Sequence, residues 1–68
     1  MDVKAFVKTL QERNISKTEL ASAIGINRAT MYRKMAENGD KFTVKEVNEI
    51  RRILDLSREQ ASSIFFAD

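Results

Sequence analysis

Two arginines, Arg28 and Arg33, carry the clearest chemistry in this chain, because a guanidinium group holds its donors in a fixed planar fork. Such a fork matches the O6 and N7 acceptors of guanine in the major groove of duplex DNA. Both arginines fall in a segment with helical periodicity, in which Met31 and Met35 form an apolar pair. At about 100° per residue, Arg33 lies roughly 200° round the helix from Met31, and Ala29 roughly 160°. The spacing therefore predicts an outward face able to touch bases.

This outward face lies at the beginning of its helix, where a helix in the major groove contacts base edges. The residues expected to contact bases are Asn27, Arg28, Ala29 and Arg33. Ala29 permits close approach and contact with a thymine methyl group. Tyr32, at the flank, either gives its hydroxyl to a phosphate or is a half-buried packing residue. The alternative for the two arginines is that they only solubilise the helix.

Contacts to phosphate are expected at the beginnings of two helices and on the flank of a third. The expected residues are Ser16, Lys17, Thr18, Tyr32, Lys41, Thr43 and Lys45. Residues 16–18 open a helix whose amides and positive dipole end favour an anion. Capping alone accounts for Thr43, and each lysine can equally be an ordinary surface residue.

Residues 16–36 predict the pair of helices that positions these side chains. Ser16 and Glu19 form a capping box at the start of the first helix. Gly25 ends it, because glycine adopts a left-handed conformation without a Cβ penalty. Asn27 then caps the second helix, and the small Ala21 side chain lets the two helices cross closely. This pattern indicates a helix-turn-helix.

Three further helices complete the predicted architecture. One runs from an Asp2 cap to about Arg13, with Asn14 as its stop, because asparagine tolerates left-handed geometry. Two others begin with capping boxes at residues 43–46 and 57–60, and the former ends near residue 55. The helix after the turn should fray near residues 37–38, with Gly39 supplying its final turn. The core-facing residues of these three helices are Val3, Phe6, Val7, Leu10, Val47, Ile50, Ile53, Leu54, Ala61, Ile64 and Phe65.

Composition bounds the possible functions. The 68 residues, 43% hydrophobic and 32% charged, indicate one all-α domain spanning residues 1–68 in the cytoplasm. Because the sequence has no cysteine or histidine, disulfides and zinc-finger ligation are excluded, and we expect no metal or other cofactor. No apolar run approaches the ~20 residues of a membrane span, so no membrane partner is expected. The carboxylates are scattered and no phosphate-cradling glycine loop occurs, so neither catalysis nor a small-molecule ligand is expected.

Positive charge is concentrated around the helix-turn-helix, although the overall net charge is only +2. Residues 13–45 hold seven basic and three acidic side chains, a net of +4, whereas residues 46–68 have a net of −2. The seven basic residues are Arg13, Lys17, Arg28, Arg33, Lys34, Lys41 and Lys45. This distribution is typical of a surface that neutralises phosphates, and ordinary solvated faces are the alternative.

Two adjacent phenylalanines, Phe65 and Phe66, cannot both enter one helical core stripe. The exposed one can anchor a symmetric contact, and two-fold dimers match two-fold operators. We therefore expect a homodimer with Phe65 and Phe66 as its contact residues, formed either in solution or only on DNA. The alternative is that the terminal phenylalanine folds back on Val3 or Phe6.

The segment ELASAIGINRATMYRKM, residues 19–35, resembles the helix-turn-helix of Cro/repressor-type (XRE-like) phage and prophage regulators. Residues 24–35 also resemble Fis-type proteins and serine recombinases, but the helices before and after the motif favour the first group. That resemblance implies a compact five-helix, lambda-repressor-like domain that dimerises on a two-fold DNA operator and represses transcription. It places Arg28, Ala29 and Arg33 against bases. The chain departs from the family at Lys34, where many members have an aliphatic core residue, and Met35 is expected to take that place.

Two functions from different classes remain open. The favoured one is a sequence-specific transcriptional regulator that binds double-stranded DNA. The other is a helical protein-interaction module, such as an antirepressor, that binds no DNA. Salt distinguishes them, because DNA binding weakens steeply as salt competes with arginine and lysine contacts.

Overall fold

The computed structural model describes residues 1–36 and 41–66, and these form five helices and no strand. The helices are α1 (Val3–Glu12), α2 (Lys17–Ala23), α3 (Arg28–Ala36), α4 (Val44–Ile53) and α5 (Arg58–Phe65). The predicted all-α class and the predicted order of helices are therefore confirmed. The expected fraying at residues 37–38 and the turn at Gly39 lie outside the described residues.

Each helix begins with the side-chain cap that its sequence predicts. Capping boxes pair Ser16 with Glu19, Thr43 with Glu46, and Ser57 with Gln60, so that each side chain bonds the other residue's backbone amide. Asp2 accepts a hydrogen bond from the Ala5 amide at 3.0 Å. Asn27 accepts one from the Thr30 amide at 2.8 Å, which caps α3. The chain therefore fixes all five helix starts through contacts three residues apart.

Among the residues described, three with positive φ turn the chain between helices. Asn14 (φ 55°) follows α1, Gly25 (φ 82°) separates α2 from α3, and Asp55 (φ 53°) follows α4. Left-handed geometry is open to glycine and to short polar side chains that bond locally, which explains the residue types at all three places. Asn14 and Gly25 are the predicted stops.

The core lies where the helices converge. Its largest fully buried side chains come from α1, α2, α3 and the end of α4, and they are Phe6, Leu20, Met31, Ile50 and Leu54. Phe6, Phe42 and Phe65 form an aromatic cluster with ring centroids 5.9–6.5 Å apart, which joins α1 and α5 to the residue before the α4 cap. Val47 and Ile53 are only partly buried at the edge of this core. None of the helices described is long and apolar enough to cross a membrane.

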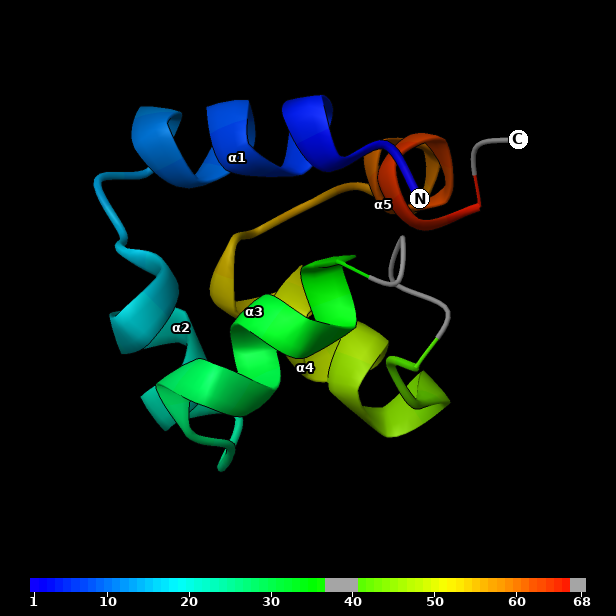
Figure 1. The fold of residues 1–68 in the computed structure, drawn as a ribbon. Coiled ribbons are helices and arrows are strands. Elements are labelled where there is room, and N and C mark those ends of the chain that lie inside the picture. The colour runs from blue at the N-terminus through cyan, green and yellow to red at the C-terminus, as the bar shows by residue number, and fades with distance from the viewer. Residues whose placement is uncertain (37–40, 67–68) are drawn as a thin grey trace.

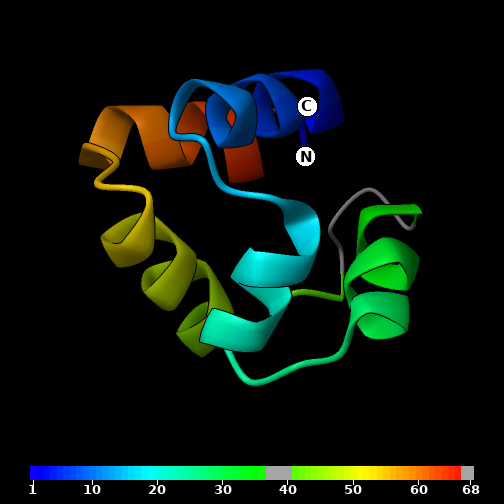
Figure 2. The same ribbon diagram turned by 90° about the vertical axis from the view of Figure 1, so that its left-hand side faces the viewer.

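The helices divide into two groups, which Figures 1 and 2 show from perpendicular directions. α1 and α5 lie at one end of the molecule, and α2, α3 and α4 lie at the other. A hydrogen bond of 2.7 Å from the Asp2 amide to the Ile64 carbonyl ties the start of α1 to α5. In Figure 2, α3 forms one edge of the molecule, and no other described helix lies beyond its outer side. The fold therefore presents one side of α3 to solvent.

Candidate nucleic-acid interface

The residues that the sequence predicts to contact bases lie at the beginning of α3 and on its outer side. Asn27, Arg28, Ala29 and Arg33 are all exposed, whereas Met31 and Met35 are buried. Because Ala29 and Arg33 are one turn apart, they share the face opposite the methionines. Ala21, whose small side chain was expected to let α2 and α3 cross closely, is buried in α2. The apolar side of α3 is thus packed against the domain, and its opposite side is exposed to solvent.

Tyr32 brings two of the candidate cations together. The Arg28 guanidinium carbon and the Lys17 ammonium nitrogen each lie 5.4 Å from the centre of its ring. These are cation–π distances, and they connect the start of α2 to the start of α3. Tyr32 is 42% exposed, so part of the residue packs on the domain and part faces solvent.

A shallow depression of about 280 Å³ lies beside this tyrosine and is lined by both polar and aliphatic side chains. Its rim includes Ser16, Lys17, Thr18 and Tyr32, which are four of the predicted phosphate contacts. The Ser16 oxygen accepts the Glu19 amide at 3.0 Å, and this leaves its hydroxyl proton able to donate to a ligand. The depression thus combines a positive charge with several hydrogen-bond donors.

The other predicted phosphate contacts lie at the beginning of α4. Lys41, Thr43 and Lys45 are exposed there, and the Thr43 hydroxyl oxygen caps α4 by accepting the Glu46 amide at 3.0 Å. In Figure 1, α2 begins to the left of α3 and α4 begins to its right. The candidate phosphate contacts therefore flank α3 on two sides, as the two strands of DNA flank a major groove.

Lys34 does not belong to the basic surface, which corrects its inclusion there. Its side chain is 11% exposed, and its ammonium group lies 2.6 Å from a Glu46 carboxylate oxygen. Met35 is in the hydrophobic core as expected, but Lys34 is buried in α3 as well. One signal in the sequence could have shown this: Lys34 lies three residues after Met31, on the helix face that the methionines define.

Comparison with known proteins agrees with this geometry. The family model of the Cro/C1-type HTH DNA-binding domain matches residues 7–63, which run from α1 into α5. The chain belongs to the Cro/C1-type family. No curated protein and no solved structure matches it significantly. The family confirms the predicted resemblance to Cro/repressor-type regulators and makes this chain a regulator that binds double-stranded DNA.

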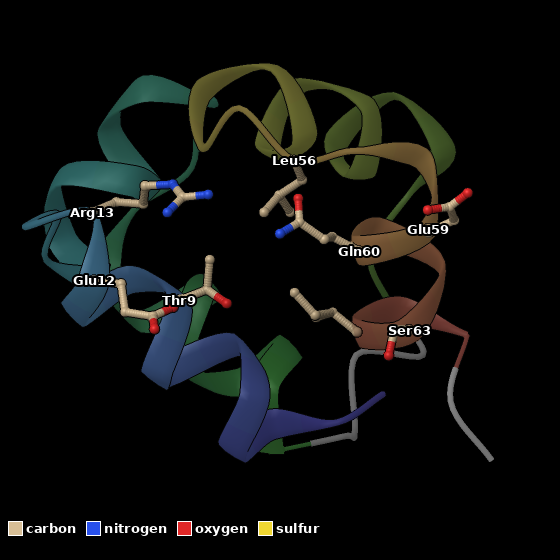
Figure 3. A pocket seen from close by; sticks show the side chains of 8 residues that line it. Thr9, Glu12, Arg13, Leu56, Glu59, Gln60 and Ser63 are labelled. Carbon is tan, nitrogen blue, oxygen red and sulfur yellow. The ribbon is translucent and has the colours of Figure 1, made fainter.

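Arg13 of this Cro/C1-type domain lies away from α3, which corrects its place in the predicted basic surface. Its Nε donates a hydrogen bond of 2.8 Å to the Leu54 carbonyl, and so links the end of α1 to the end of α4. Figure 3 shows Arg13 at an open cleft of about 360 Å³ between α1 and α5, with Glu12 and Gln60 nearby. The basic residues left around α3 are Lys17, Arg28, Arg33, Lys41 and Lys45.

The basic side chains of the Cro/C1-type domain differ in whether a described carboxylate pairs with them. Within residues 1–36 and 41–66, the only ion pair joins Lys34 to Glu46, so no described carboxylate neutralises Arg28 or Arg33. Burial of the Glu46 carboxyl raises its pKa, but the hydrogen bond and charge of Lys34, with hydrogen bonds from Thr43, outweigh this effect and lower the pKa below its ordinary value of 4.5. Glu46 therefore stays ionised and holds Lys34.

The two terminal phenylalanines of the Cro/C1-type domain have different environments. Phe65 is buried against Phe6 and Phe42, so its side chain is not on the surface where a dimer contact was expected. Phe66 is 71% exposed and does not fold back on the core. Of the expected pair, only Phe66 offers a ring to a partner.

Proposed function

We propose that this domain is a sequence-specific transcriptional repressor that places α3 in the major groove of an operator. One observation carries the proposal: α3 is packed on its methionine side, presents Ala29 and Arg33 on the opposite side, and has an exposed Arg28 as its first residue. In this proposal the two arginines donate to guanine O6 and N7, and Ala29 contacts a thymine methyl. Asn27, at the cap, lies next to the same bases.

Phosphates on the two sides of the groove would hold the domain in place. On one side, Lys17 and Tyr32 contact the backbone together with the Ser16 and Thr18 hydroxyls. On the other side, Lys41, Thr43 and Lys45 do so. These contacts carry no sequence information of their own, but they fix the register of α3 on the duplex. Repression then requires only that the bound domain occupy a promoter, which suits a small Cro-like protein of a phage or prophage, acting in the bacterial cytoplasm.

We infer a homodimer for the same function, with Phe66 in its contact. Phe66 borders a groove of about 350 Å³ between α4 and α5, which is also lined by Phe42, Val44 and Ala61. Val44 is 79% exposed, so this apolar surface is open to solvent. A two-fold contact brings the same patch of both copies together, so that each Phe66 can bury its ring against the partner's groove. Two copies of α3 would then read two half-sites.

A binding selection from random duplex DNA tests the function. The expected product is an inverted repeat with half-site centres about one helical turn, or 10–10.5 bp, apart. Binding to the selected site should weaken steeply with salt. Phe66→Ser should leave the half-site sequence unchanged while lowering affinity for the full repeat. Failure to enrich any sequence would contradict the function and favour a protein-interaction module such as an antirepressor.

A further inference from the structure

A single carboxylate oxygen connects the start of α4 to the inner side of α3. Oε1 of Glu46 accepts the backbone amide of Thr43 at 2.9 Å and the ammonium group of Lys34 at 2.6 Å. The same ammonium group donates to the Lys41 carbonyl at 3.1 Å and lies 5.6 Å from the Phe42 ring. Lys34 is thus held from three directions by the segment that begins α4.

Capping does not require this lysine. The Ser57 box of α5 has Gln60 in the position of Glu46, and the Ser16 box of α2 has an exposed Glu19. Both close without a buried cation, since the only ion pair of the described ranges is the one at Glu46. The Lys34 contact is therefore an addition to the cap, and its effect must be sought outside α4.

Net stability is also a weak explanation for the pair. Removing two charges from water costs free energy that their attraction only partly returns, so that apolar side chains of similar volume are often equally stabilising. Lys34 lies beside Met31 and Met35, where a methionine side chain of similar length would fit. What the charged pair adds is a fixed orientation of Lys34 relative to Glu46. An apolar contact tolerates sliding and rotation, whereas a hydrogen bond to one oxygen does not.

Because Lys34 is part of α3, its fixed orientation also affects the position of the exposed Arg33. Arg33 precedes Lys34 and lies about 100° away round the same helix. A rotation of α3 by about 20° moves a group about 6 Å from the helix axis by about 2 Å. Such a displacement breaks hydrogen bonds, whose donor–acceptor distances span only about 2.7–3.2 Å. The orientation of α3 must therefore be fixed for an arginine to distinguish one base from another.

We propose that Lys34 and Glu46 are positioning residues, which hold α3 at the rotation and tilt that allow its arginines to read bases. The inference rests on the proposed function. It predicts that the pair determines the ratio of operator affinity to random-sequence affinity more than it determines folding. Affinity for random DNA depends mainly on phosphate contacts, and all of the proposed ones except Tyr32 lie outside α3, so this affinity depends less on the rotation of α3.

The test uses the double variant Lys34→Met with Glu46→Gln, which keeps the net charge unchanged and leaves no buried charge without a partner. Gln60 closes the capping box of α5, so a glutamine at position 46 should close that of α4. We expect a urea midpoint close to that of the wild type, random-DNA affinity within about threefold, and operator affinity at least tenfold lower. An unchanged operator-to-random ratio in this folded variant would overturn the proposal.

A matched control is Lys8→Met with Glu59→Gln, which makes the same chemical changes at two exposed positions and should not alter the ratio. If the first double variant does not fold, Lys34→Arg provides a second test, because it keeps the charge but replaces a compact ammonium with a longer planar group. We expect its ratio to fall at least threefold, and a wild-type ratio would overturn the proposal. If the wild type itself shows no preferred DNA sequence, the proposed function fails instead.

Discussion

The Arg28 guanidinium lies 5.4 Å from the Tyr32 ring, one turn along the same helix, and Lys17 approaches that ring from α2 at the same distance. A residue expected to contact a base and one expected to contact a phosphate therefore share one aromatic support. Side chains that rest on a common ring lose fewer conformations on binding, because they are already ordered. The aromatic ring thus holds a candidate base contact and a candidate phosphate contact next to each other.

Replacement of Tyr32 should weaken DNA binding through this shared support. We expect Tyr32→Ala to cost about 1–2 kcal/mol of binding free energy, because both cations lose the cation–π contact and the phosphate loses a hydroxyl donor. Tyr32→Phe, which keeps the ring, should cost less. Fluorescence anisotropy with labelled operator measures both. Equal losses for the two variants would assign the whole effect to the hydroxyl.

Arg33 and Lys17 should respond differently to substitution. Arg33→Ala should lose about 1–3 kcal/mol on the operator and tolerate other bases at one position. Lys17→Ala should weaken binding to all sequences alike and reduce the slope of log K against log salt by about 1. Titrations with the operator and its single-base variants at several salt concentrations distinguish these effects. Uniform loss across sequences for Arg33→Ala would exclude a base contact.

Gly25→Ala should destabilise the domain through its backbone alone. An added Cβ meets nothing within 4 Å, but φ is +82°, a conformation that alanine adopts at a cost of about 1–2 kcal/mol. For a domain of this size, 1 kcal/mol lowers Tm by about 4–8 °C. Gly25→Asn should lose less, because asparagine serves at Asn14 with φ 55°. Circular dichroism melts measure both, and an unchanged Tm for Gly25→Ala would contradict this explanation.

Acid should destabilise the domain through Glu46. Because folding lowers the pKa of this carboxyl below 4.5, its stabilisation is fully present above that pH and is lost as the pH falls through the lower, folded value. Between about pH 6 and pH 3, the wild type should therefore lose more stability than the Lys34→Met, Glu46→Gln variant, by an amount on the order of 1 kcal/mol. Urea unfolding across this range makes the comparison. Parallel pH profiles would show that the pair contributes no acid sensitivity.

The sequence determined where the helices begin, how α1 and α2 end, and which side of α3 faces outward. Ser16, Thr43 and Ser57 cap their helices as predicted, and Gly25 turns the chain between α2 and α3. These features depend on contacts within about four residues and on allowed backbone angles, so they can be read before any tertiary contact is known. The exposure of Arg33 follows from the buried Met31 by helical geometry alone.

Only the tertiary structure decided which charged and aromatic side chains the core retains. Lys34 reaches Glu46 twelve positions further along the chain, and Arg13 reaches the Leu54 carbonyl across 41 positions. Phe65 and Phe66 are adjacent, yet the aromatic cluster buries one and leaves the other in solvent. Contacts at such separations depend on how the helices pack, because packing sets both the distance between two groups and their exclusion from water.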